Sequence, residues 1–151
     1  MTEFFKSLTI FLDFLKDLIS TFSHKNHGDL NTKRYKVLSP IYAILIDKNE
    51  LLQSNHGMHA SDEAIASTQD LFNDYSLILM KNDALLKDHQ INVFLRTMAL
   101  IYNLQSALND LRYNAPSRMQ DYQNLLKTVS KLRKKVNRSL HKCRKVLRLL
   151  C

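Results

Sequence analysis

Residues 125–150 read LLKTVSKLRKKVNRSLHKCRKVLRLL, and their apolar positions recur with the period of an α-helix. Three or four positions separate successive members of this series: Leu125, Val129, Leu132, Val136, Leu140, Cys143, Leu147 and Leu150. Such spacing places them in one narrow stripe along a helix, with Val146 at its edge. No glycine or proline follows Pro116, so we predict one long basic helix over residues 117–151.

The rest of this helix surface is strongly basic. Lys and Arg side chains occupy the remaining arc of about 200° around the helix axis. We take these ten as candidate nucleic-acid or polyanion-binding residues: Lys127, Lys131, Arg133, Lys134, Lys135, Arg138, Lys142, Arg144, Lys145 and Arg148. Residues 121–151 carry a net charge of +9, whereas residues 1–120, with 12 basic and 13 acidic side chains, carry −1. Cations three and four positions apart repel each other, at a cost of about 0.2–0.5 kcal/mol per pair. The pattern therefore favours an anionic partner over a face that only contacts solvent.

Three classes of partner suit such a helix, and they make different demands on it. No aromatic residue follows Tyr122, so base stacking is not available, whereas contact with a phosphate backbone requires only cations. Helices that lie on an anionic membrane surface usually have a broader apolar face with Trp or Phe. We therefore expect nucleic-acid binding without sequence specificity, with an anionic membrane surface as the second candidate. The third is a protein partner, which would make the protein a helical adaptor or inhibitor; pairing of its amphipathic helices would give a homo-oligomer.

The composition of the chain predicts an all-α fold. Its 151 residues include only two Gly and two Pro, too few for the many turns that a β-sheet requires. Besides the C-terminal helix, the stretches with apolar residues at helical spacing are 32–54, 61–81 and 91–114. Pro40 falls inside the first of them, so that helix either kinks there or begins at Ser39. We predict an antiparallel bundle of about four helices, together with a further helix at the N-terminus.

The same spacing predicts which side chains these helices bury. They are Tyr35, Leu38, Tyr42, Leu45 and Leu52 in the first stretch, Ile65, Thr68, Phe72, Tyr75 and Leu79 in the second, and Ile91, Phe94, Leu95, Met98, Ile101, Tyr102 and Leu108 in the third. Ser61, which precedes two acidic residues, is a typical helix start. Ser117 and Gln120 have the spacing of a capping box, which predicts the start of the basic helix.

Residues 4–22 form a further amphipathic pattern at the start of the chain. Five Phe residues, together with Leu and Ile, fill about half of the helical cylinder. The charged residues of the other half are Lys6, Asp13, Lys16 and Asp17. These charges argue against a plain membrane span, which needs about 20 apolar residues. We expect this helix either to pack in the core or to lie in a membrane interface. The predicted domains are thus an N-terminal amphipathic helix, residues 1–23, and a helical bundle, residues 32–151.

The sequence predicts neither a catalytic nor a metal site. Two histidine pairs have a spacing found among metal ligands: His24 with His27, and His56 with His59. The predicted helix between the pairs would hold them roughly 30 Å apart. Glycine-rich phosphate loops and paired-cysteine motifs are absent, and Cys143 and Cys151 are too far apart along one helix for a disulfide. We therefore expect a non-enzymatic protein without metal or cofactor, cytoplasmic or, in the alternative, membrane-associated.

Overall fold

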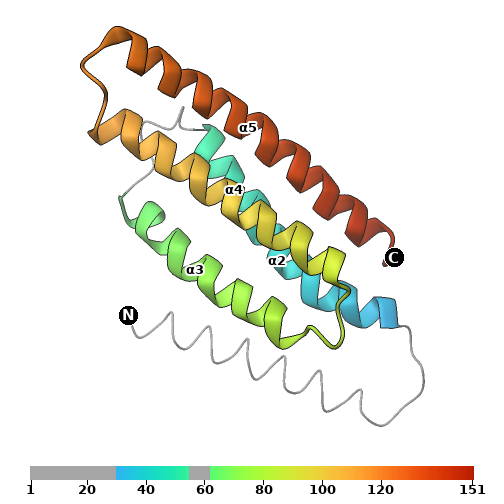
Figure 1. Ribbon diagram of the computed structural model, residues 1–151. Coiled ribbons are helices and arrows are strands. Elements are labelled where there is room, and N and C mark those ends of the chain that lie inside the picture. The colour runs from blue at the N-terminus through green and yellow to red at the C-terminus, as the bar shows by residue number, and fades with distance from the viewer. Residues whose placement is uncertain (1–29, 55–61) are drawn as a thin grey trace. The chain divides into compact units, whose positions relative to one another are not determined.

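The computed structural model of the protein describes residues 30–54 and 62–151, and the regular secondary structure in these ranges is entirely α-helical (Figure 1). The helices are α2 (Leu30–Ser54), α3 (Asp62–Lys81), α4 (Asp88–Tyr113) and α5 (Met119–Arg148). They pack together, so the prediction of an all-α bundle is confirmed for this part of the chain. The predicted helix over residues 4–22, the Ser61 cap and both histidine pairs lie outside the described residues.

Neighbouring helices run antiparallel, as contacts between their side chains show. The Ser76 hydroxyl oxygen of α3 lies 3.6 Å from the Met98 sulfur of α4. Thr97, in the first half of α4, meets Ser139, in the second half of α5, so these two helices form a hairpin. The start of α2 reaches the loop between α3 and α4, where Arg34 Nε donates to the Leu85 carbonyl over 2.7 Å. These contacts place the beginning of α2, the end of α3 and the beginning of α4 at the same end of the bundle (Figure 1).

The core of the described residues is built mainly from aliphatic side chains, together with Phe72, Phe94, Met98 and Cys143. The largest apolar side chains that are almost completely buried are Phe94, Leu38, Ile41, Leu45, Leu79, Ile101, Leu104 and Val136. Full burial of a side chain of this size stabilises the fold by about 1.5–3 kcal/mol before entropic costs. The helices therefore depend on their shared apolar faces more than on intrinsic propensity, which is usual for helices of this length in proteins.

The prediction of a buried position is wrong for two residues, Tyr35 and Tyr102. Tyr35 and Tyr102 are 37% and 42% exposed, whereas Ile41 and Leu104, which were not predicted to be buried, are at most 1% exposed. A tyrosine at the edge of an apolar stripe keeps its hydroxyl group in water, and an aliphatic neighbour can fill the centre without that requirement.

Pro40 lies in the interior of α2, which continues through it from Leu30 to Ser54. The alternative that this helix begins at Ser39 is therefore wrong. Proline removes one backbone hydrogen bond and costs about 3 kcal/mol in a helix interior. Burial of Leu38 and Ile41 on either side of Pro40 offsets that cost, because both side chains lie in the core.

The predicted capping box at the start of α5 is also wrong. The helix begins at Met119, its N-cap is Arg118, and no side chain caps it. Ser117 precedes the N-cap, so its hydroxyl group is out of register with the first free amide groups of the helix. Asp121 lies in the first turn, where a negative charge interacts favourably with the helix dipole.

Candidate functional site

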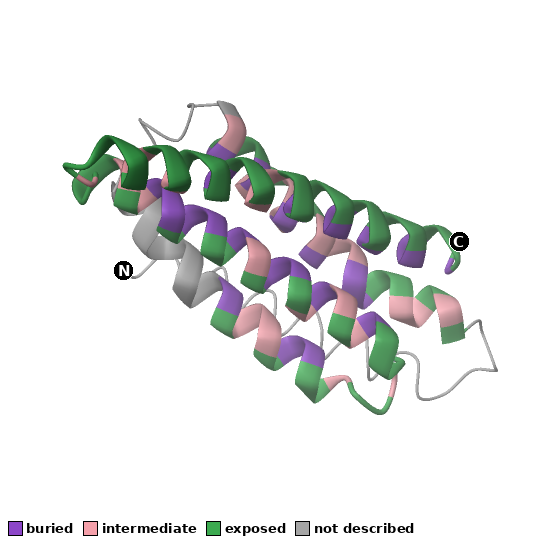
Figure 2. Ribbon diagram, turned by 45° about the horizontal axis from the view of Figure 1, so that its top comes forward, coloured by how far each residue is buried: buried purple, intermediate pink, exposed green. Residues whose placement is uncertain are grey.

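From Val129 onward, helix α5 presents one buried and one exposed face (Figure 2). It has 30 residues, which corresponds to about 45 Å at 1.5 Å per residue. Its buried apolar residues are Val129, Val136, Leu140, Cys143, Val146 and Leu147. Leu125 and Leu132, the remaining members of the predicted stripe on this helix, are half-buried. The stripe packs on the bundle and thereby turns the opposite face toward solvent.

Nine of the ten candidate cations lie on that exposed face. The exposed ones are Lys127, Lys131, Lys134, Lys135, Arg138, Lys142, Arg144, Lys145 and Arg148. Arg133 is half-buried, and its Nε atom is buried without a hydrogen-bond partner in the described part of the chain. Between Lys127 and Arg148, every exposed residue of α5 is polar. This set of cations, which we call the basic face, therefore forms a continuous surface.

Helix α5 carries only one acidic residue, and this residue lies outside the basic face. Asp121 is the single acid of α5, and it lies one and a half turns before the first cation, Lys127. Within the ranges that the structure describes, none of the ten cations forms an ion pair. Among the described residues, no ion pair compensates these positive charges, so this part of the chain has a positive surface potential along α5.

Three small polar side chains attach α5 to α4. The Thr97 hydroxyl donates to the Val93 carbonyl over 2.8 Å, which leaves its oxygen to accept from Ser139 over 2.7 Å. The sulfur of Cys143 lies 3.2 Å from the same oxygen. Burial raises the pKa of the Cys143 thiol to about 11, so it is neutral at physiological pH. This buried cluster fixes α5 on α4 and, with it, the direction in which the basic face points.

Amide side chains attach α5 to α2. Asn49 and Gln53 of α2 both donate to the Asn137 side-chain oxygen of α5, over 3.3 and 3.5 Å. Gln53 also donates to the Asn49 oxygen over 3.3 Å, so the three amides form one network. Because Asn137 borders the basic face, this network holds one edge of that face against α2.

Helix α2 also brings an aromatic residue to the cationic end of α5. Burial raises the pKa of the Tyr42 hydroxyl, and the positive charges of Arg144 and Arg148 partly oppose this effect. Tyr42 is half-buried beside these two arginines. The sequence predicted Tyr42 as a core residue and the basic helix as free of aromatics. Tyr42 lies beside the two arginines because α2 packs beside α5. No local sequence motif could have indicated this proximity.

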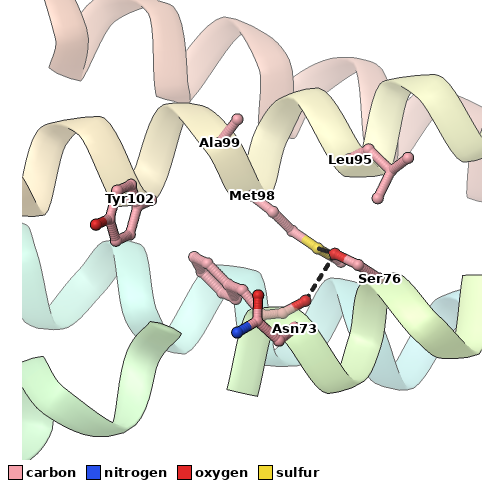
Figure 3. A pocket seen from close by; sticks show the side chains of 7 residues that line it. Asn73, Ser76, Leu95, Met98, Ala99 and Tyr102 are labelled. Atoms are coloured by element: carbon pink, nitrogen blue, oxygen red, sulfur yellow. Dashed lines mark hydrogen bonds between the residues drawn. The ribbon is translucent and has the colours of Figure 1, made fainter. Parts of the chain in front are cut away.

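A groove lies between α3 and α4 (Figure 3). It is an open groove of about 270 Å³, lined by Phe72, Asn73, Ser76, Leu95, Met98, Ala99 and Tyr102. The lining includes no carboxylate, histidine or cysteine. Its polar groups are an amide and two hydroxyls, and one of these, from Ser76, already donates to the Phe72 carbonyl over 2.7 Å.

The described residues include no group of three or more His, Cys, Asp or Glu side chains arranged to hold a metal ion. In the same part of the chain, every helix is too short or too polar to cross a membrane. Comparison of the chain with protein-family models, with curated proteins and with solved structures found no match. The basic face is thus the feature on which a functional interpretation depends.

Proposed function

We propose that this protein is a non-enzymatic binding protein whose basic face contacts the phosphate backbone of nucleic acid without sequence specificity. The observation that carries the proposal is the exposure of nine cations on one face of a single helix, without ion pairs among the described residues. Phosphate contacts need positive charge and reach, which lysine and arginine supply, and they read no base.

The energetics of α5 also support an anionic ligand. Lys131, Lys134 and Arg138 are successive neighbours at helical spacing, and each such pair repels by about 0.2–0.5 kcal/mol. A phosphate backbone replaces this repulsion by attraction, and the release of condensed counterions drives association entropically. In the absence of a ligand, the buried stripe keeps the helix folded, because the stripe belongs to the core of the bundle.

A second candidate is an anionic membrane surface, which the sequence of residues 4–22 favours. We propose that this segment is an amphipathic helix, and its five Phe residues would suit the interface between headgroups and acyl chains. In that case the basic face would interact with anionic lipid headgroups and would still need the same cations.

Parallel binding assays distinguish the two candidates. We would measure binding of the full chain to nucleic acid and to vesicles of anionic lipid, at low salt. The double variant Lys134→Gln and Lys145→Gln removes two charges from the basic face. The double variant Lys81→Gln and Lys87→Gln is its matched control, because it removes the same charge from exposed lysines outside α5.

We expect tight binding to nucleic acid, loss of affinity in the first variant and little change in the control. Binding to vesicles alone would replace this proposal by the membrane candidate. If neither ligand bound, the acidic groove of a protein partner would be the remaining class.

A further inference from the structure

We propose that α5 binds in the major groove of B-form duplex DNA. This inference rests on the proposed function and narrows it to one form of nucleic acid. Three properties of α5 support it: the width of its exposed half, the cations along both edges of that half, and the polar character of all the exposed residues between them.

The exposed half of α5 matches the groove in width. A helix with its side chains is about 10–12 Å across, and the major groove of B-DNA, about 12 Å wide, admits an α-helix. At 3.6 residues per turn, the exposed residues from Arg144 through Lys134 to Lys135 cover about half of the cylinder. The other half lies on the bundle, and Figure 2 shows the exposed half standing clear of it. As far as the described helices are concerned, it can therefore enter a groove without their rearrangement.

Cations line both edges of the exposed half. Arg144 and Arg148 lie at the edge beside α2, where they approach Tyr42. Lys135 and Lys142 lie at the opposite edge, roughly 150° away around the helix axis. The two phosphate strands of a duplex line opposite walls of the major groove, so each edge would face one strand. A single strand can follow only one of these edges at a time.

The length of the basic face sets the number of contacts. From Lys127 to Arg148 it extends about 32 Å at 1.5 Å per residue, close to the roughly 34 Å of one turn of B-DNA. A straight helix leaves the curved groove before it completes that turn. About half of the ten cations can therefore reach phosphates at the same time.

The first test compares three nucleic acids of the same sequence and length: duplex DNA, duplex RNA and single-stranded DNA. The major groove of A-form RNA is deep and narrow and does not admit protein side chains, although both duplexes carry the same number of phosphates. We expect duplex DNA to bind at least about eightfold more tightly than the other two, since a single lost phosphate contact costs about eightfold in affinity at 0.1 M salt.

The second test removes one edge at a time. One variant is Arg144→Gln with Arg148→Gln, and the other is Lys135→Gln with Lys142→Gln. Each should weaken binding to duplex DNA by up to roughly 60-fold at 0.1 M salt, because each loses two phosphate contacts. The control, Lys81→Gln with Lys87→Gln, should retain wild-type affinity. Thermal melting establishes that all variants are folded.

The outcomes separate this inference from the proposed function. Equal affinity for the three nucleic acids, or an effect of only one edge on duplex DNA, would overturn binding in the groove and leave general phosphate binding in place. If none of the three bound, both the groove inference and the proposed function would be withdrawn.

Discussion

A single hydroxyl group connects three side chains at the contact between α4 and α5. Thr97 Oγ1 lies 2.7 Å from Ser139 Oγ and 3.2 Å from Cys143 Sγ, and all three residues are buried. A polar group that loses its partner inside a protein keeps its desolvation cost of about 1–3 kcal/mol. The cluster therefore favours one register of α5 against α4, since a slide of either helix would leave these groups unpaired.

Removal of the Thr97 hydroxyl should destabilise the protein. The Thr97→Val variant keeps the shape of the side chain but leaves Ser139 without this acceptor, so we expect the free energy of unfolding to fall by about 1–3 kcal/mol in a urea titration. Thr97→Ser is the control, because it keeps the hydroxyl and loses one methyl group, at a cost of about 1 kcal/mol. A valine variant as stable as wild type would show that the hydroxyl group contributes no net stability.

The two cysteines should differ strongly in reactivity. Burial raises the pKa of Cys143 from 9.0 to about 11, so at pH 8 its thiolate fraction is about 100-fold below that of an ordinary thiol. The thiolate is the reactive species, and Cys143 is also shielded from solvent, whereas Cys151 is exposed. We expect a thiol reagent at pH 8 to modify one cysteine rapidly in the native protein and the second only after unfolding. Peptide mapping should place the rapid modification at Cys151, and rapid modification at Cys143 would contradict the buried position.

At the scale of a whole helix, α5 carries the buried stripe on one face and the proposed binding surface on the other. Leu140 is 5% exposed on the buried stripe, and Leu149, just after the helix, is 80% exposed. We expect Leu140→Ala to lower the free energy of unfolding by about 2–5 kcal/mol, through lost burial and the cavity that remains. Leu149→Ala is the matched control, and it should change stability by less than about 0.5 kcal/mol.

Nucleic-acid binding by the Leu140→Ala variant is the complementary measurement. Below its melting temperature, Leu140→Ala should bind nucleic acid as wild type does, because the basic face keeps all its charges. If its stability were unchanged, the stripe would not be a packing surface. If its stability fell and binding by the folded variant fell with it, the exact path of α5 on the bundle would matter for the ligand.

Helical periodicity and the scarcity of Gly and Pro were sufficient to predict the fold class and the stripe of α5. Six of its eight predicted apolar residues are buried. The sequence was less informative where a tertiary contact decides the outcome. Ile41 rather than Tyr35 fills the core, because a hydroxyl group at the edge of a stripe prefers solvent. Similarly, α2 continues through Pro40 because packing on both sides offsets the lost hydrogen bond.

The candidate site was predictable only in part. A list of cations follows directly from the sequence, but their common exposure depends on how α4 and α2 hold the helix. Arg133 belongs to the same run of basic residues and is nevertheless half-buried. Tyr42 is distant in sequence and lies beside Arg144 and Arg148 only because α2 packs along α5. Such pairings between helices are determined by the arrangement of the bundle, which local patterns do not contain.

For the whole molecule, the distribution of charge matters more than its total. The net charge of +8 arises almost entirely from residues 121–151, since the rest of the chain is close to neutral. A polyanion would therefore be attracted to α5, and this attraction would orient the protein before contact. The near-neutral remainder adds little to the long-range field, so the salt dependence of binding should report on α5 alone.

That salt dependence is the last prediction. With about five phosphate contacts at about −0.9 each, a plot of log K against log salt should have a slope of about −4 to −5 on duplex DNA. Two duplexes of unrelated sequence should give the same slope and similar affinities, because phosphates carry no sequence information. Lys142→Gln, at one edge of the exposed half, should flatten the slope by about one unit on both duplexes, whereas Lys81→Gln, outside α5, should leave it unchanged. A slope shallower than about −2, or one that differs between the two sequences, would mean that base contacts or apolar contacts dominate and that the cations of α5 are not the main source of affinity.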